Sequence, residues 1–194
     1  MTAEKFRAVA ARVNHFQSQG HCTRAAGWGL NSRIHAVGDG AEWIRWQCRE
    51  VFGDQGHLLC DYFHVCEYLS AAPSCRPAQP DPWPRTQQQR LKQGHAPKVV
   101  ATLAEHLEAE GTPETDAPVR NGHRYLNNRL DCLDYPLALS LGLPIGCGLI
   151  ESGHRHMLQA RLKKAGAAWL ADHADQIAHI PVLRANSQWS SIWN

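Results

Sequence analysis

The chain has 194 residues, of which 43% are hydrophobic and 20% are charged, an ordinary globular composition that excludes an intrinsically disordered chain. No apolar run reaches the roughly 18 residues that a membrane span needs, and the first residues lack the apolar core of a signal peptide. The formal net charge is +2, so charge alone does not identify a nucleic-acid-binding protein. We therefore expect a cytoplasmic protein without a membrane partner, built as one domain or one domain with a small appendage.

Cysteine and tryptophan are both frequent, with seven of each in the chain. No two cysteines have the Cys-x-x-Cys spacing, which argues against a zinc ribbon or a thioredoxin-like redox site. We predict reduced cytosolic thiols, several of them buried. Because tryptophan buries a large apolar area, we also predict that most of the seven tryptophans are core anchors.

Helix and strand patterns alternate over the first 71 residues. Two short apolar runs, Arg33–Gly38 and Gly56–Asp61, are typical of strands. Apolar residues at helical spacing predict helices over Ala3–Gln19, Ala41–Phe52 and Phe63–Ala71. The alternation predicts an α/β layer with parallel strand pairing.

The second half of the chain opens on a proline-rich segment. Five prolines lie between Ala72 and Arg85, so we predict a surface loop there and exclude a helix or a central strand. Beyond it the pattern is helical, apart from a tight glycine-rich turn at Gly142–Gly148. Helices are predicted over Thr86–Gln93, Lys98–Glu110, Val119–Leu133, Leu149–Ala165 and Trp169–Ile180.

Two aspartates close the predicted strands. Asp39 lies between two glycines, and Asp61 is followed at helical spacing by His64. Ligands of open α/β sheets bind at the carboxyl ends of the strands, where paired carboxylates suit a hard divalent ion. Each aspartate has a structural alternative as the cap of the following helix. A further alternative is a zinc site made of Cys60, His64 and Cys66, although no fourth ligand stands at a typical spacing.

Glu151 follows the glycine-rich turn, in the first turn of a predicted helix, and is the third candidate carboxylate. Its alternative role is electrostatic, because the helix dipole favours a carboxylate in the first turn. The same helix carries a run of basic side chains, which suit phosphate contacts or, alternatively, form a solvated face. These side chains belong to Arg155, His156, Arg161, Lys163 and Lys164. Two strand-end aspartates, a helix-borne glutamate and a basic helix together suggest a two-metal phosphoryl-transfer site on an RNase H-like fold.

Three motifs, in their order and spacing, resemble the bacterial insertion-sequence transposases of the Kra type, in the Mutator-like branch of the DDE transposases. They are Val37–Ile44, Leu59–His64 and Gly142–Ser152. Asn128-Arg129, Tyr135-Pro136, Arg161–Lys163 and Trp189–Trp193 look like the same family. The resemblance runs from about Ala36 to the C-terminus.

The resemblance implies an RNase H-like fold whose triad of acids binds two Mg²⁺ or Mn²⁺ ions. By the family pattern, Asp39 matches the second acid and Glu151 the last, and both would hold metal directly. Asp61 and His64 match an Asp-x-x-His motif, and we expect them to orient the site from behind the metal ligands. The enzyme would hydrolyse a phosphodiester at the element end and join the freed 3′-OH to target DNA. Backbone contacts with that DNA are expected from Arg155, Arg161, Lys163 and Lys164.

The first acid of the triad has no match in this sequence. The carboxylates upstream of Asp39 amount to Glu4, which lies in a predicted helix. A competing assignment makes Asp39 and Asp61 the first two acids, but they are only 61 − 39 = 22 positions apart, too few for the intervening strands. Two further departures are Cys147, where the family turn has Ser, and Pro181, in what should be the last helix. We therefore expect the C-terminal part of a transposase, from a longer protein or a truncated gene, without transposition activity of its own.

The predicted architecture is an RNase H-like α/β core with an incomplete sheet, an inserted helical segment and C-terminal helices. Residues 1–71 form the partial core, residues 72–141 the helical insertion, and residues 142–194 the glycine turn, the Glu151 helix and the helices that complete the core. The expected partners are transposon ends and target DNA, in a nucleoid-associated homo-oligomer of the intact transposase. The alternatives are a non-catalytic remnant that binds DNA or dimerises, and a hydrolytic nuclease that uses Asp39, Asp61 and Glu151.

Overall fold

The computed structural model describes residues 23–24, 27–72, 82–185 and 187–193. The chain divides into two compact units, Met1–Gly146 and Cys147–Asn194, each with its own packing. The predicted helix Ala3–Gln19 and most of the proline-rich segment lie outside the described residues. Among the helices that are described, none is long and apolar enough to cross a membrane.

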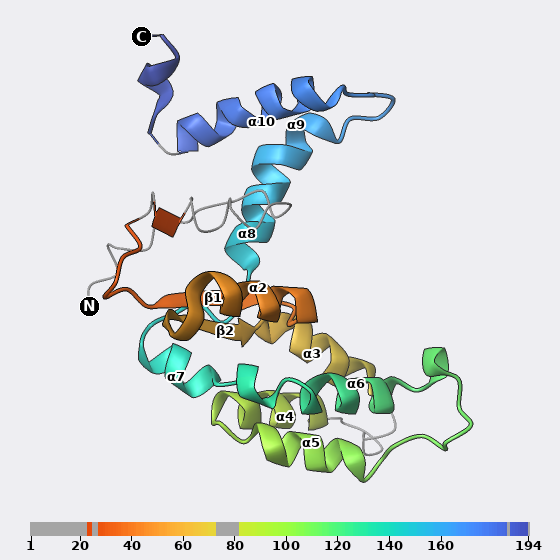
Figure 1. The fold of residues 1–194 in the computed structure, drawn as a ribbon. Coiled ribbons are helices and arrows are strands. Elements are labelled where there is room, and N and C mark those ends of the chain that lie inside the picture. Colours follow the sequence, from red (N-terminus) through yellow and green to blue (C-terminus); the bar gives the residue numbers. More distant parts are fainter. Residues whose placement is uncertain (1–22, 25–26, 73–81, 186, 194) are drawn as a thin grey trace. The chain divides into compact units, whose positions relative to one another are not determined.

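A two-stranded parallel sheet is the centre of the first unit. Strands β1 (Ile34–Gly38) and β2 (Gly56–Cys60) pair in register over all five residues of each strand. Helix α2 (Glu42–Phe52) and the short turn η2 (Gly53–Gln55) connect them (Figure 1). A parallel pair requires a crossover of this kind. The mixed α/β class and the parallel pairing expected from the sequence are thereby confirmed.

Helices cover both faces of β2. Its successive residues Leu59 and Cys60 have no exposed surface, and successive side chains of a strand point to opposite faces. Helix α3 (Tyr62–Ala71) follows the strand directly and buries Val65 and Leu69 in the same core. An element that is buried on both faces is typical of parallel sheets. Helices therefore surround the carboxyl end of the sheet.

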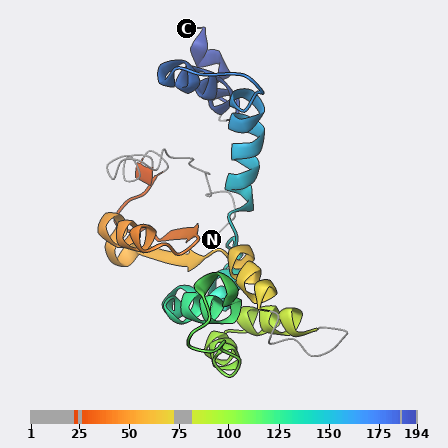
Figure 2. The ribbon, with the colours of Figure 1, turned by 90° about the vertical axis from the view of Figure 1, so that its right-hand side faces the viewer.

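The remaining helices of the first unit gather on the same side of β1 and β2, in yellow-green to turquoise in Figures 1 and 2. Leu91, Leu103 and Leu126 are fully buried among them. The helices are α4 (Trp83–Lys92), α5 (Ala96–Ala104), α6 (Pro118–Asn127) and α7 (Tyr135–Ser140), with the short turns η4 (Glu114–Asp116) and η5 (Leu130–Cys132).

Several boundaries differ from those predicted. Helix α4 begins at Trp83, inside the segment predicted as a loop, because its Pro84 lies in the first turn, where a missing N–H leaves no hydrogen bond unmade. The predicted helix Val119–Leu133 ends at Asn127, and Lys98–Glu110 is shortened to α5. Helix α7 was not predicted from the sequence pattern at all; it is short, and its apolar residues are split between core and surface.

The second unit consists of helices and a short turn in its described residues. Its elements are α8 (Gly148–Gly153), the π-helical η6 (His154–Gln159), α9 (Ala160–Leu162), α10 (Ala171–Ala185) and η7 (Trp189–Ile192). The helix predicted over Leu149–Ala165 thus contains a wide π-turn stretch. Helix α10 continues through the buried Pro181 instead of ending at Ile180.

The expectation that most tryptophans are core anchors is wrong. Trp28 and Trp83 pack against the core, but the other five expose between 43% and 73% of their surface. Trp43 and Trp46 lie on the outward side of α2, one helical turn apart. The three others belong to the second unit, where little of the described surface is buried. The expected burial of several cysteines is confirmed: the five that the structure describes are free thiols, and Cys48, Cys60 and Cys132 are buried.

Candidate functional site

Asp39 is the first residue after β1, at the carboxyl end of the sheet, and it is exposed. Its Oδ1 accepts a hydrogen bond from the Ala41 N–H at 2.9 Å. This bond makes a local turn instead of a helix cap, because the N-cap residue of α2 is Ala41 and has no side-chain cap. The strand thus ends in a carboxylate that is held by one backbone donor and faces solvent.

Gly40, the next residue, is required by the space and by the backbone. Its φ is +71°, in the region that favours glycine. A Cβ here would lie 2.6 Å from Sγ of Cys60 and 2.8 Å from Cδ of Arg129, both closer than real contacts allow. The Asp-Gly pair is therefore needed where this loop passes over the end of β2.

Substituting Gly40 tests this close approach. We expect Gly40→Ala to lower the free energy of unfolding by about 2 kcal/mol, from backbone strain plus overlap with its neighbours. Gly142 is the matched control, because it has φ +65° but no atom within 4 Å of the place where an alanine methyl group would lie. Gly142→Ala should cost about 1 kcal/mol, from the backbone alone. Urea unfolding of both variants measures the difference, and equal losses would contradict the packing argument.

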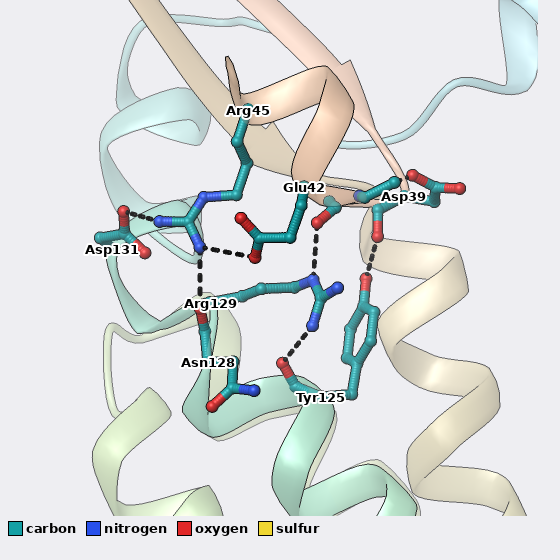
Figure 3. Close-up of polar contacts among 9 residues, drawn as sticks. Asp39, Glu42, Arg45, Tyr125, Asn128, Arg129 and Asp131 are labelled. Atoms are coloured by element: carbon teal, nitrogen blue, oxygen red, sulfur yellow. Dashed lines mark hydrogen bonds and ion pairs between the residues drawn. The ribbon is translucent and has the colours of Figure 1, made fainter. Parts of the chain in front are cut away.

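Two side chains of the helical segment hold the Asp39–Gly40 loop by its carbonyl groups (Figure 3). The Tyr125 hydroxyl donates to the Asp39 carbonyl oxygen at 2.6 Å, and Arg129 Nε donates to that of Gly40 at 2.8 Å. The Arg129 guanidinium also stacks on the Tyr125 ring, 4.2 Å from its centroid. Burial raises the pKa of Tyr125 far above its usual value, so its hydroxyl stays a donor. The candidate carboxylate therefore sits on a loop with a fixed backbone.

Tyr125 was not predicted from the sequence, and Arg129 entered only through the dipeptide Asn128-Arg129, which looks like that of the transposase family. The two residues are 86 and 89 positions from the loop carbonyls they bind, so no local pattern reveals the contacts. An unusual density of Tyr, Asn and Arg near the end of a predicted helix is the only signal that the sequence carries.

Arg45 ties α2 to the segment that follows α6. Its Nη1 donates to the Asn128 carbonyl at 2.9 Å, and its Nη2 pairs with Asp131 at 2.6 Å (Figure 3). Glu42 lies 3.5 Å from the same guanidinium. Helix α2 is thus tied to the helical segment on both sides of its first turn.

Asp61 follows β2 but differs from Asp39 in its surroundings. Only 4% of it is exposed, and its Oδ1 accepts the N–H groups of Phe63 at 2.7 Å and His64 at 3.2 Å. The alternative of a helix cap is therefore confirmed for Asp61. Its own N–H donates to the Gly38 carbonyl at 2.6 Å, which completes the pairing of the two strand ends.

His64 is linked to Asp61 through its backbone, while its ring has other partners. Nδ1 lies 3.2 Å from the Glu67 carboxylate, and the ring meets Tyr68 and Tyr125 edge to face at 5.5 and 5.6 Å. The Asp61 carboxylate accepts the backbone N–H of His64. The His64 ring therefore packs against Tyr125, the residue whose hydroxyl holds the Asp39 loop.

The zinc alternative needs several ligating side chains close together. No set of three or more His, Cys, Asp or Glu side chains in the described part of the chain could hold a metal ion. The proposed ligands Cys60, His64 and Cys66 therefore have no geometric support.

Glu151 belongs to the second unit, in the first turn of α8, where it is exposed. The Cys147 thiol donates to its Oε1 at 3.7 Å, so the residue that replaces the family serine still faces the glutamate. Arg155, Lys163 and Lys164 are exposed in the same unit. Arg161 turns back and donates to the carbonyls of His156 and Met157. Because Asp39 lies in the other unit, the meeting of the two acids stays a prediction.

Comparison with known proteins gave a match to one family model, which covers all of these residues. The family model described as "Uncharacterised protein family (UPF0236)" matches residues 29–190. The chain belongs to UPF0236. Comparison with curated proteins and comparison with solved structures each gave no match. The UPF0236 match includes every residue predicted for the site, from Asp39 to Lys164, as well as Tyr125 and Arg129.

Proposed function

We propose that this chain is the catalytic part of a DDE transposase with an RNase H-like core. The observation that carries the proposal is Asp39: an exposed carboxylate at the carboxyl end of one of two parallel strands, on a loop whose backbone is held from α6. A rigid element that presents a carboxylate is what metal-dependent phosphoryl transfer requires. The three sequence motifs add the family resemblance, and the finer identity as a Kra-type transposase rests on them.

Asp39 and Glu151 fit a hard divalent cation by their chemistry. Both are exposed carboxylates, and one oxygen of each has a single hydrogen-bond donor, the Ala41 N–H for Asp39 and the Cys147 thiol for Glu151. Oxygen ligands of this kind suit Mg²⁺ or Mn²⁺. When bound, the ions would supply an activated water and would neutralise charge on the leaving oxygen.

The other residues have supporting roles in the proposal. Asp61 holds the start of α3 and the end of β2 in place, and His64 packs against Tyr125, which holds the Asp39 loop. Both would therefore orient the site without touching the metal. Arg155, Arg161, Lys163 and Lys164 would contact the DNA backbone, and the intact transposase would act as a homo-oligomer on its transposon ends and target.

A nicking assay on supercoiled plasmid with Mn²⁺ tests the proposal. We expect wild-type protein to nick the plasmid only with metal, and Glu151→Ala to abolish the nicking. Strand transfer should be absent in both, because two carboxylates do not position two ions as three do. Robust Mg²⁺-dependent strand transfer by these 194 residues would contradict that expectation.

The second candidate is a non-catalytic remnant that binds DNA or dimerises with an intact transposase. It is favoured by the absence of a three-ligand metal group from the residues that the structure describes. Its signature in the same assay is a wild-type protein that retards the plasmid on a gel without nicking it, with or without Mn²⁺.

A further inference from the structure

A cavity of about 430 Å³ lies against the loop-holding residues of the first unit. It is bounded by the first turn of α2, by α3 and by the outer side of α6. Donor groups dominate its wall, with two arginines, two asparagines and two tyrosines against two carboxylates. The lining residues are Glu42, Tyr68, Glu114, Asn121, Arg124, Tyr125, Asn128 and Arg129.

The charges on the cavity wall are paired, with one exception. Arg124 forms an ion pair with Glu114, and Glu42 lies within ion-pair distance of Arg45. Arg129 has no carboxylate within ion-pair distance among the described residues, where its partners are two backbone carbonyls and a ring. Arg129 is therefore the one lining arginine that has no ion-pair partner in the described part of the chain.

The Arg129 guanidinium is held in one orientation and still has hydrogen-bonding capacity. Nε and Nη1 donate to Gly40 and Tyr125, whereas Nη2 makes no hydrogen bond to any described residue. Figure 3 shows the guanidinium beside the Tyr125 ring and below the Asp39 loop, with the Asp39 carboxylate pointing away from it. A planar cation with free N–H groups, fixed beforehand, matches the oxygens of a phosphate.

We propose that Arg129 binds a backbone phosphate of DNA in this cavity, next to the candidate catalytic loop. The inference rests on the proposed function, since it assigns to Arg129 a phosphate of the same strand that Asp39 would act upon. Four of the lining residues, Glu42, Glu114, Arg124 and Asn128, are exposed, so the cavity is open to a polymer and not only to a small ion. Asn121 and Asn128 supply neutral donors beside the cation.

The test is the salt dependence of DNA binding, measured by fluorescence anisotropy with a labelled duplex. The slope of log K against log salt concentration is negative, and each lost phosphate contact reduces its magnitude by about 0.9. We expect Arg129→Gln to weaken binding and to reduce the magnitude of the slope by about that amount, while Arg129→Lys keeps the wild-type slope. Arg49→Gln, an exposed arginine of α2 that does not line the cavity, should leave both quantities unchanged.

The comparison separates a phosphate contact from a merely structural role. If Arg129 only anchors the loop, both substitutions break the Gly40 contact, weaken binding alike and leave the slope unchanged, and that result overturns the inference. An unchanged affinity in Arg129→Gln, or no DNA binding by wild type at low salt, overturns it too. Circular dichroism on each variant verifies that the fold is retained.

The outcome is independent of the nicking assay. A slope of reduced magnitude in Arg129→Gln, together with nicking that does not depend on Asp39 or Glu151, would leave the phosphate site standing and remove the transposase. An unchanged slope with nicking that depends on both acids would do the reverse.

Discussion

Replacing Asp61 by Ala is expected to lower the free energy of unfolding by about 2–4 kcal/mol. The carboxylate is almost fully buried, and it accepts two backbone N–H groups at the start of α3. Removing it leaves both donors without a partner in a part-buried place, which costs more than losing a cap at an exposed one. Chemical unfolding in urea, with the midpoint and the slope both fitted, measures the loss.

Asp134→Ala is the matched control for this prediction. Asp134 is also an N-cap aspartate, at α7, but it is exposed and accepts one N–H, from Leu137 at 3.1 Å. Its replacement should cost about 1 kcal/mol. A loss as small for Asp61 as for Asp134 would show that burial adds nothing to the cap.

Asp39→Asn is expected to impair activity and to leave stability nearly unchanged, unlike Asp61→Ala. Its Mn²⁺-dependent nicking should fall by about 100-fold or more, equivalent to about 2.7 kcal/mol of activation free energy. The amide oxygen of Asn can still accept the Ala41 N–H, and the side chain is exposed, so the free energy of unfolding should change by less than about 0.5 kcal/mol. The substitution removes the negative charge that a divalent cation needs and leaves the loop in place.

Nicking rates with a Mn²⁺ titration, beside urea unfolding of the same preparations, measure both halves of this prediction. Glu50→Gln is the control, because Glu50 is another exposed carboxylate of the first unit, on α2, and does not line the cavity. It should retain its nicking rate. If Asp39→Asn nicks like wild type, the metal ligand has been assigned to the wrong residue.

The two strand-end aspartates thus have different surroundings although they occupy equivalent positions in the sheet. Gly38 and Cys60 are register partners, so Asp39 and Asp61 leave the sheet at the same edge. The difference comes from the next residues of the chain: Gly40 turns the backbone before α2 begins, whereas α3 begins directly after Asp61. An aspartate directly before a helix becomes its cap, and one that is two residues further away keeps its carboxylate exposed.

The sequence alone determined the local features of this protein. The strand–helix–strand order predicted the parallel pair, the residue pattern offered a cap role for Asp61, and the glycines marked the turns, because these signals act over a few residues. The same local pattern predicted that Asp39 lies at the carboxyl end of a strand.

Only the tertiary structure decided which residues hold the Asp39 loop and which apolar side chains are exposed. Tyr125 and Arg129 reach the loop from α6 and the turn after it, across 86 and 89 positions of sequence, and the exposed faces of Trp43 and Trp46 depend on which side of α2 meets the core. Contacts of this kind arise from the packing of whole elements against each other. Periodicity says that a helix has an apolar face, but the elements that cover that face are chosen by the three-dimensional packing.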